Sequence, residues 1–218
     1  MIKAVIFDCD GVINTYRTVG ECHRKIGLPE DLDISWMRDY YSGKISYKQW
    51  EKNLAQFYKS ISLNKETYLQ YMSQYVINSE AIELISYIKK LGLPMCIISS
   101  GFDIYVKKIA QELGIHDWYC NLVVHFNNNN VFQRIDTFDD EVEAKVEQLA
   151  MFCSNHFIRM SECLYVGDSE NDIGIFRATK HGVLYRSKNK LCKEETWKEV
   201  QSLVEIVDIL KYEQTGNS

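Results

Sequence analysis

The chain has 218 residues, more than one typical domain and fewer than two, so a main domain with a smaller insertion is expected. Its net charge of −5 provides no broad basic surface, which argues against nucleic acid as a partner. No apolar run approaches the roughly 20 residues that span a bilayer, and the start lacks the features of a signal peptide. Seven cysteines without a C-x-x-C pair indicate reduced thiols, so we expect a cytoplasmic protein with no membrane partner.

The first element predicted is a buried parallel strand over Ile2–Phe7, a short β-branched run that stops at the acid-glycine segment Asp8-Cys9-Asp10-Gly11. Residues 14–75 then change character, with many aromatic and charged side chains and no strand-like run. We interpret residues 14–75 as a helical insertion, called the cap below. Residues 1–13 and 76–218 would form the core domain.

Short β-rich runs alternate with helical patterns after the cap. Ile82, Ile85 and Ile88 mark one face of a helix that ends at Leu91-Gly92, and Met95–Ser99 is the next buried strand. A helix is predicted from Asp103 to about Leu113, with Gly114 as its stop.

The remaining elements continue this alternation. The predicted elements are a hairpin of Leu122–Phe126 and Val131–Gln133 around the tip Asn127–Asn130, a helix from about Asp140 to Cys153, a strand over Cys163–Gly167, a helix from Asn171, a strand over Gly182–Tyr185, and a last helix carrying Trp197, Val200, Leu203, Val204, Ile206, Val207 and Leu210. This order predicts an α/β fold with a Rossmann-like, doubly wound parallel sheet and a small helical cap after the first strand. The hairpin tip is equally well explained as a plain surface loop or as a functional flap.

Polar side chains follow three of the predicted strands. Asp8 and Asp10 follow the first strand, where their spacing places both carboxylates on one side. Ser99-Ser100-Gly101 follows the second, and its hydroxyl, backbone amides and helix N-terminus suit an anion. The run from Gly167 to Asp172 follows a third strand, and its carboxylates suit magnesium.

Each of these groups also has a structural explanation. Acids after a strand form turns, a serine-glycine turn is common, and Asp or Ser with neighbouring acids caps helices. Ligands of open parallel sheets bind beyond the carboxyl ends of the strands, where all three groups would meet. A phosphate and metal site at that edge is therefore predicted.

Four segments together resemble the motifs of the haloacid dehalogenase superfamily, in the right order. They are Asp8-Cys9-Asp10-Gly11-Val12, Ile98-Ser99-Ser100-Gly101-Phe102-Asp103, Lys145 and Gly167-Asp168-Ser169-Glu170-Asn171-Asp172. The segment Ser99–Asp103, the run to Leu113-Gly114 and Cys120-Asn121 are further similar to the phosphoserine phosphatase branch. The resemblance covers most of the chain outside the cap.

The resemblance implies a role for each matching residue. Asp8 would attack phosphorus in line, and Asp10 would protonate the leaving oxygen and then activate water. Ser99 and Lys145 would hold the phosphoryl oxygens, with Gly11, Ser100 and Asn171 beside them in the phosphate site. Lys145 also fits a solvated helix face, and Lys107 and Lys108 are weaker candidates for its role.

The cofactor that the resemblance implies is Mg²⁺, bound by Asp8, Asp168 and the Asp10 backbone carbonyl. Asp172 would act on the ion through a water molecule, or would contact the ligands and not the ion. A dianionic phosphate facing four aspartates would otherwise meet several kcal/mol of repulsion at an effective dielectric of about 20. Metal dependence is therefore expected on physical grounds.

The substrate is predicted only as a small phosphate ester. Val12 and Ser100 depart from the phosphoserine phosphatases, which usually carry threonine and glycine there. Neither the acidic residue nor the cap arginine on which their specificity depends can be placed, so phosphoserine is one candidate but is not favoured. Cap residues that could face substrate are Tyr16, Arg17, Glu21, Arg24 and Trp50.

Two alternatives to a phosphomonoesterase stay open at this point. A phosphomutase of the same superfamily would return phosphate to its sugar, and a receiver-like module would bind magnesium and accept phosphate without turnover. A receiver has no need of an insertion after its first strand, which favours the enzyme. A dehalogenase is disfavoured because Asp10 would have no leaving oxygen to protonate.

Overall fold

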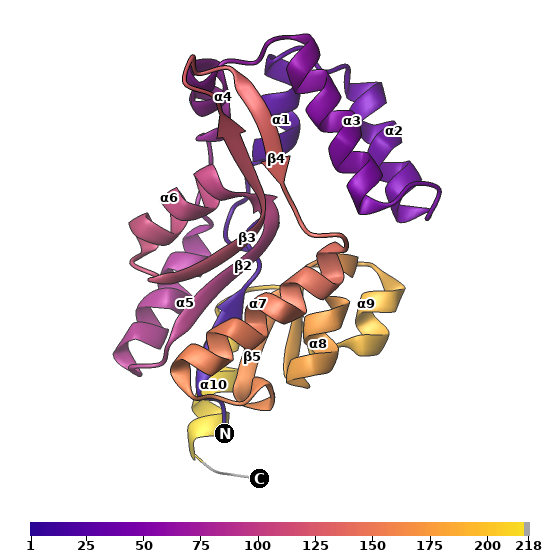
Figure 1. Ribbon diagram of the computed structural model, residues 1–218. Helices are drawn as coiled ribbons and strands as arrows, with labels where there is room; N and C mark the ends of the chain where they lie inside the picture. Colours follow the sequence, from indigo (N-terminus) through magenta and orange to yellow (C-terminus); the bar gives the residue numbers. More distant parts are fainter. Residues whose placement is uncertain (216–218) are drawn as a thin grey trace.

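A seven-stranded sheet forms the centre of the computed structural model, which describes residues 1–215 (Figure 1). Its order is β4-β3-β2-β1-β5-β6-β7, and every neighbouring pair is parallel except β3 with β4. The strands are β1 (Ala4–Phe7), β2 (Met95–Phe102), β3 (Asp117–Phe126), β4 (Phe132–Asp136), β5 (Cys163–Gly167), β6 (Gly182–Tyr185) and β7 (Lys198–Val200). This is the mostly parallel α/β sheet that the sequence predicts.

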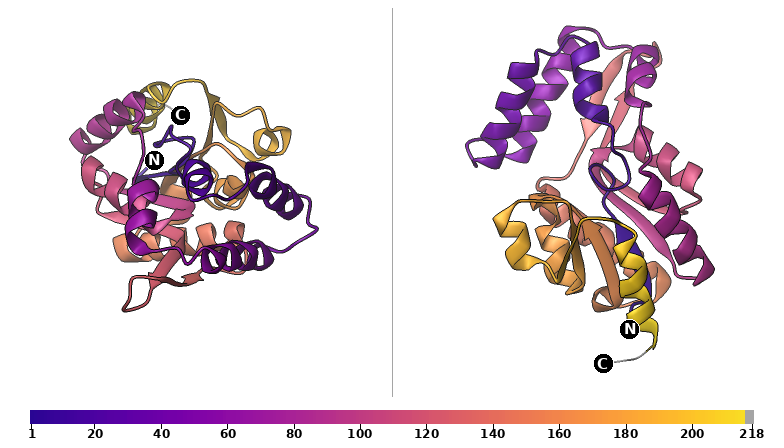
Figure 2. Two further views of the ribbon diagram at one scale, coloured as in Figure 1. Left: turned by 90° about the horizontal axis from the view of Figure 1, so that it is seen from above. Right: turned by 180° about the vertical axis from the view of Figure 1, so that it is seen from behind.

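Helices cover both faces of this sheet. The helices are α1 (Thr18–Lys25), α2 (Glu30–Tyr41), α3 (Tyr47–Ser60), α4 (Lys65–Met72), α5 (Ser79–Lys90), α6 (Asp103–Leu113), α7 (Glu141–His156), α8 (Ile173–Thr179), α9 (Lys190–Glu195) and α10 (Glu205–Thr215), with two 3₁₀ turns at Met160–Glu162 and Glu170–Asp172. Helices α5, α6 and α10 pack on one face, and α7, α8 and α9 on the other (Figure 2). The residues of β1 alternate between the two faces: Val5 and Phe7 pack in the core of the first face, and Ala4 and Ile6 pack in that of the second.

The cap helices α1 to α4 all lie in the insertion between β1 and α5, and they stand at the carboxyl end of the sheet (Figure 1). Helix α3 buries an aromatic side that includes Tyr47, Trp50 and Tyr58, whereas α2 has no fully buried residue. The exact boundaries of the cap, residues 14–75, stay a prediction.

The β3–β4 hairpin extends away from the sheet and is attached to the cap. The Phe132 amide donates to the Leu63 carbonyl at 2.8 Å, and the Lys65 amide donates to the Asn130 carbonyl at 2.8 Å. The Phe132 ring packs edge-on against Tyr58, with 5.2 Å between ring centroids. A hairpin is confirmed here, and its tip is part of the cap contact rather than a plain surface loop.

Several predicted elements are confirmed closely. Helix α6 and strands β5 and β6 have the predicted bounds, and Gly114 ends α6 in the left-handed conformation with φ of 62°. At the hairpin tip, Asn130 has the expected positive φ, 59°. All seven cysteines are free thiols, and no helix within residues 1–215 is long and apolar enough to cross a membrane.

Other predictions were wrong in detail. The helical face of α5 is formed by Ala81, Leu84, Ile85 and Ile88, while Ile82 is exposed. The last apolar run does not form one helix: Val200 belongs to the edge strand β7, and α10 begins only at Glu205. Helix α9, whose first turn is capped by the Asn189 side chain, was not predicted.

Candidate active site

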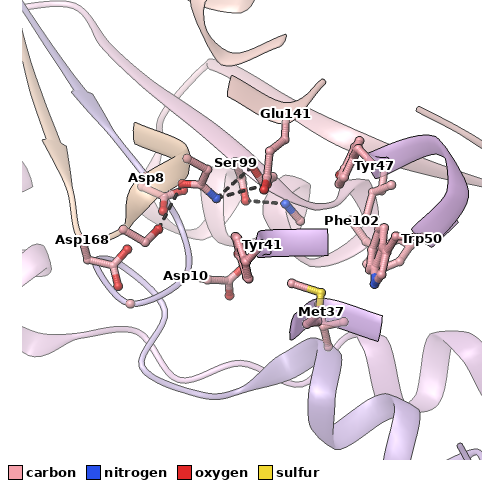
Figure 3. A pocket seen from close by; sticks show the side chains of 17 residues that line it. Asp8, Asp10, Met37, Tyr41, Tyr47, Trp50, Ser99, Phe102, Glu141 and Asp168 are labelled. Atoms are coloured by element: carbon pink, nitrogen blue, oxygen red, sulfur yellow. Dashed lines mark hydrogen bonds between the residues drawn. The ribbon is translucent and has the colours of Figure 1, made fainter. Parts of the chain in front are cut away.

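The carboxyl ends of β1, β2 and β5 deliver the predicted polar residues to one place, as parallel strands do. A cavity of about 350 Å³ opens there between the sheet and the cap. Its lining includes Asp8, Asp10, Gly11, Ser99, Ser100, Asp168 and Asn171 from the predicted site. In Figure 3, Asp8, Asp10 and Asp168 lie at one end of this cavity, while Tyr47, Trp50, Phe102 and Met37 lie at the other.

Asp8 lies directly after β1 and is almost fully buried, with 4% of its surface exposed. Its Oδ1 accepts a hydrogen bond from the Cys9 amide at 2.7 Å and lies 3.2 Å from Lys145 Nζ. Burial raises the pKa of Asp8 well above its ordinary range, Lys145 opposes that shift, and the neighbouring aspartates add to it. The ionised form of Asp8 therefore depends on positive charge placed beside it.

Lys145 reaches the site from α7 and is completely buried. Its Nζ donates to Asp172 Oδ1 at 2.7 Å, to Asn171 Oδ1 at 3.0 Å and weakly to the Tyr165 hydroxyl at 3.4 Å. Burial alone would lower the pKa of Lys145, but the carboxylates of Asp172 and Asp8 outweigh burial and raise it. Lys145 is therefore a fixed positive charge, whereas Lys107 and Lys108 are exposed on α6.

Asp172 is fully buried, and both of its carboxylate oxygens are engaged. Oδ1 accepts from Lys145 and from the Tyr165 hydroxyl at 2.6 Å, and Oδ2 accepts from the amides of Asp168 at 2.9 Å and Ser169 at 3.2 Å. These contacts tie the loop after β5 to Lys145. Asp172 thus acts on the site mainly by holding Lys145 and Asp168 in place.

A metal ion could be held where the carboxylates meet. One oxygen each from Asp8, Asp168 and Asp172 lie within 4.8 Å of one another. Burial, with Asp172 adding to it, raises the pKa of Asp168 to about 6, so this group and Asp8 both favour a cation beside them. Hard carboxylate oxygens without histidine or cysteine fit a hard divalent cation.

Gly11 makes the approach of Asp168 possible. It has a φ of 81°, and a Cβ added there would lie 2.1 Å from Asp168 Oδ2. The Gly11 amide donates to the Asn14 carbonyl at 2.9 Å, so it is not free for phosphate. The contribution of Gly11 is the space it leaves.

Asp10 is held from two sides by residues that sequence reasoning did not identify. Asn14 Nδ2 donates to Asp10 Oδ1 at 2.8 Å, and the Tyr105 hydroxyl donates to Oδ2 in a short hydrogen bond. Burial raises the pKa of Asp10, and these two hydrogen bonds lower it. The first turn of α6 could not be linked to Asp10 by sequence spacing, because 95 residues separate the two.

The serines differ from the expected turn because β2 continues through them to Phe102. The pairing of β2 with β3 shifts register between Ser99 and Phe102. Ser99 Oγ accepts from the Gly101 amide at 3.0 Å, which leaves its own proton available to a ligand. Ser100 Oγ faces the Asn171 and Asn121 amides at 3.2 and 3.3 Å.

Asn171 links several parts of the site. Its Oδ1 accepts from Lys145 and from Ser169 Oγ at 3.0 Å, and its Nδ2 donates to Ser100 and to Glu141 Oε2 at 3.2 Å. With both ends engaged, Asn171 orients Lys145 and Ser100. Glu141 was not among the predicted site residues, although it lines the cavity.

Of the five cap residues that the sequence suggested could face substrate, Trp50 lines the cavity. Arg17, Glu21 and Arg24 line a separate small groove at the start of α1 and α2, and Tyr16 faces a third depression near Gln74. The spacing of aromatic residues in the cap gives no signal for which of them turn inward.

The family follows from comparison with known proteins. A model of the haloacid dehalogenase-like hydrolases matches residues 2–178, so the chain belongs to this family. It is a phosphatase of the haloacid dehalogenase type, which sets aside the receiver-like alternative.

Phosphoserine phosphatases are the relatives it resembles. The chain is 24% identical to the phosphoserine phosphatase of Methanocaldococcus jannaschii over 96% of this chain and 97% of that protein. It is 23% identical to that of Campylobacter jejuni subsp. doylei over 96% and 100%.

Solved structures agree in fold. A phospho-aspartyl intermediate analogue of phosphoserine phosphatase has a TM-score of 0.79 over 95% of this chain and 98% of that chain, at 24% identity. A substrate-bound phosphoserine phosphatase complex gives 0.78 over 97% and 98%, at 23% identity. The haloacid dehalogenase fold predicted from the motifs is thereby confirmed.

Proposed function

We propose that the protein is a Mg²⁺-dependent phosphomonoesterase that hydrolyses small-metabolite phosphate esters through an aspartyl-phosphate on Asp8. The observation that carries this proposal is the contact of the buried Asp8 carboxylate with the Lys145 ammonium at 3.2 Å, beside Asp168 in one carboxylate cluster. Asp8 and Asp168 would hold the ion with the Asp10 carbonyl. The ion would neutralise phosphate charge when bound.

In the first half-reaction, an Asp8 oxygen attacks phosphorus while the bond to the leaving oxygen breaks. Asp10 gives its proton to that oxygen, and the alcohol departs. Burial raises the pKa of Asp10, which is the direction that a proton-donating carboxyl group needs. Lys145 and the free proton of Ser99 face the phosphoryl oxygens and stabilise their charge.

In the second half-reaction, the Asp10 carboxylate takes a proton from water, which attacks the phosphorus of the aspartyl-phosphate. The bond between phosphorus and the Asp8 oxygen breaks, and inorganic phosphate leaves. Asn14 and Tyr105 hold Asp10 in one position for both steps. Asn171 and Asp172 keep Lys145 beside Asp8 throughout.

The test is release of inorganic phosphate from phosphoserine, sugar phosphates, nucleotides and an aryl phosphate, with magnesium or with EDTA. We expect turnover only with magnesium, and at least a roughly 1,000-fold loss in Asp8→Asn. Asp208→Asn is the matched control because Asp208 is exposed on α10. Turnover that persists in Asp8→Asn would refute the aspartyl-phosphate route, and stoichiometric rather than repeated phosphate release would refute hydrolysis.

A further inference from the structure

The cavity has a second half, which faces the cap and takes no part in the phosphate chemistry. Its apolar or aromatic side chains include Met37, Tyr41, Tyr47, Trp50, Phe102 and Leu122. Figure 3 shows Tyr47, Trp50 and Phe102 together at the end remote from Asp8 and Asp168. The leaving group of a phosphate ester bound at Asp8 would extend toward this end.

This half of the cavity offers no partner for a carboxylate. Within residues 1–215, no lysine, arginine or histidine is among the lining residues. Lys145, the buried ammonium group of the phosphate site, is already committed to Asp8 and Asp172. A carboxylate in the leaving group would therefore be desolvated without compensation, which disfavours phosphoserine.

Glu141 also lines the cavity without belonging to the carboxylate group that could hold a metal, and only 4% of its surface is exposed. It accepts a hydrogen bond from Asn171 at 3.2 Å. No cationic group lies within salt-bridge distance of Glu141 in the described part of the chain. Glu141 helps to raise the pKa of the nearby Lys145, and the Tyr40 hydroxyl also hydrogen-bonds it, but no cation contacts it directly. A buried carboxylate without a cation in direct contact can receive one from a ligand.

The aromatic rings next to Glu141 also favour positive charge. Tyr47 and Trp50 stack on each other with 5.3 Å between centroids and 12° between ring planes, and Tyr40 packs against Tyr47 at 5.4 Å. The faces of such rings carry partial negative charge and attract ammonium groups, trimethylammonium groups above all. Aromatic faces beside a buried carboxylate form a site for an organic cation.

We infer that the substrate is the phosphate ester of a compact amino alcohol, whose ammonium group binds between Glu141 and the aromatic rings of Tyr41, Tyr47 and Trp50. This inference rests on the proposed function, because the phosphate must lie at Asp8. The cavity of about 350 Å³ has room for a phosphate and the few carbon atoms of such an ester.

The test compares phosphocholine with 3,3-dimethylbutyl phosphate, which has the same shape but carbon in place of the charged nitrogen. We expect kcat/KM to be at least about tenfold higher for phosphocholine, since a desolvated cation at aromatic faces contributes that much or more. Phosphoethanolamine, phosphoserine and an aryl phosphate complete the panel. Phosphoserine should be poorer than both amino alcohol esters.

Variants identify the groups that recognise the cation. The quantity compared is the ratio of kcat/KM for phosphocholine to kcat/KM for 3,3-dimethylbutyl phosphate. Glu141→Gln keeps the size of the side chain and should bring the ratio toward one, and Trp50→Leu should reduce it as well. Glu143→Gln, an exposed change on the same helix, should leave the ratio as in the wild type. Because each variant is compared with itself on two substrates, a general loss of activity cancels.

The outcomes separate the two proposals. The inference would be overturned by equal rates with phosphocholine and 3,3-dimethylbutyl phosphate, by a preference for phosphoserine, or by a ratio unchanged in Glu141→Gln. In each of these cases, turnover of the aryl phosphate would still uphold the proposed function. Absence of magnesium-dependent turnover with every substrate would overturn the proposed function and this inference with it.

Discussion

In the proposed mechanism Asp10 acts as an acid in one step and as a base in the next, and the structure holds both of its oxygens. Asn14 donates to one oxygen and Tyr105 to the other, and the contact with Tyr105 depends on Gly101. A Cβ on Gly101 would lie 1.7 Å from the Tyr105 hydroxyl. Gly101 of the second motif thus leaves room for the hydrogen bond that holds Asp10 of the first motif.

Tyr105→Phe is expected to lower kcat about tenfold or more, because a hydrogen bond to a charged group contributes roughly 1.5–3 kcal/mol. KM should change little, since Tyr105 does not line the cavity. Steady-state kinetics with an aryl phosphate measures both constants. Tyr75→Phe is the control because it also removes a tyrosine–carboxylate hydrogen bond, to Glu112, but outside the site. An equal loss in both variants would contradict a specific role for Tyr105.

Gly11→Ala should abolish the gain in thermal stability that Mg²⁺ gives the wild type, because the new methyl group would displace Asp168. Gly43→Ala separates this effect from backbone strain. Gly43 has a φ of 73°, and a Cβ there would meet nothing within 4 Å. Both variants should lose about 1 kcal/mol of stability from the positive φ. If melting curves show a normal Mg²⁺ response in Gly11→Ala, the steric role of Gly11 is wrong.

At the level of elements, the hairpin and the cap stabilise each other. Phe132→Ala on β4 should lower the free energy of unfolding by about 3–5 kcal/mol, because the ring is buried against Tyr58. It should also raise KM by loosening the cap. Denaturant unfolding and kinetics would measure the two effects. Phe138→Ala, at a ring that is 37% exposed, should cost far less, and similar losses in both variants would argue against the contact.

Strands that are buried on both faces could be predicted from the sequence, whereas an edge strand could not. Strands β5 and β6 are apolar runs buried on both faces, so their limits are visible in the sequence. Edge strand β7 has only Val200 buried and the polar residues Lys198 and Glu199 beside it, so its apolar residue was assigned to the helical pattern that follows. The family motifs predicted Asp8, Asp168 and Lys145 at one place. Tyr105 and Glu141 carry no such motif and are brought to the site only by the packing of α6 and α7.

For the whole molecule, stability and metal binding should be linked through pH. Burial, aided by Asp172, raises the pKa of Asp168 to about 6, above its ordinary value of about 3.9. Between these values the folded, metal-free protein binds more protons than the unfolded chain. Its stability from this group therefore falls as pH rises through this range. A cation that needs the ionised carboxylate opposes this loss.

The increase in melting temperature caused by Mg²⁺ should accordingly be larger at about pH 7.5 than at about pH 5. Differential scanning calorimetry with Mg²⁺ or EDTA at each pH provides the comparison. Asp168→Asn should show little Mg²⁺ response at either pH. A response that is the same at both pH values in the wild type would show that Asp168 does not link protons to the metal.

The division of the cavity between core and cap has a consequence for how such a protein can diversify. Every residue proposed to act on phosphorus lies outside α2 and α3, whereas Met37, Tyr41, Tyr47 and Trp50 all lie within them. Because α2 has no fully buried residue, changes there disturb the core little. Substitutions in α2, at Met37 and Tyr41, should therefore redirect substrate choice while the proposed reaction chemistry is kept, which makes α2 a natural target for directed evolution.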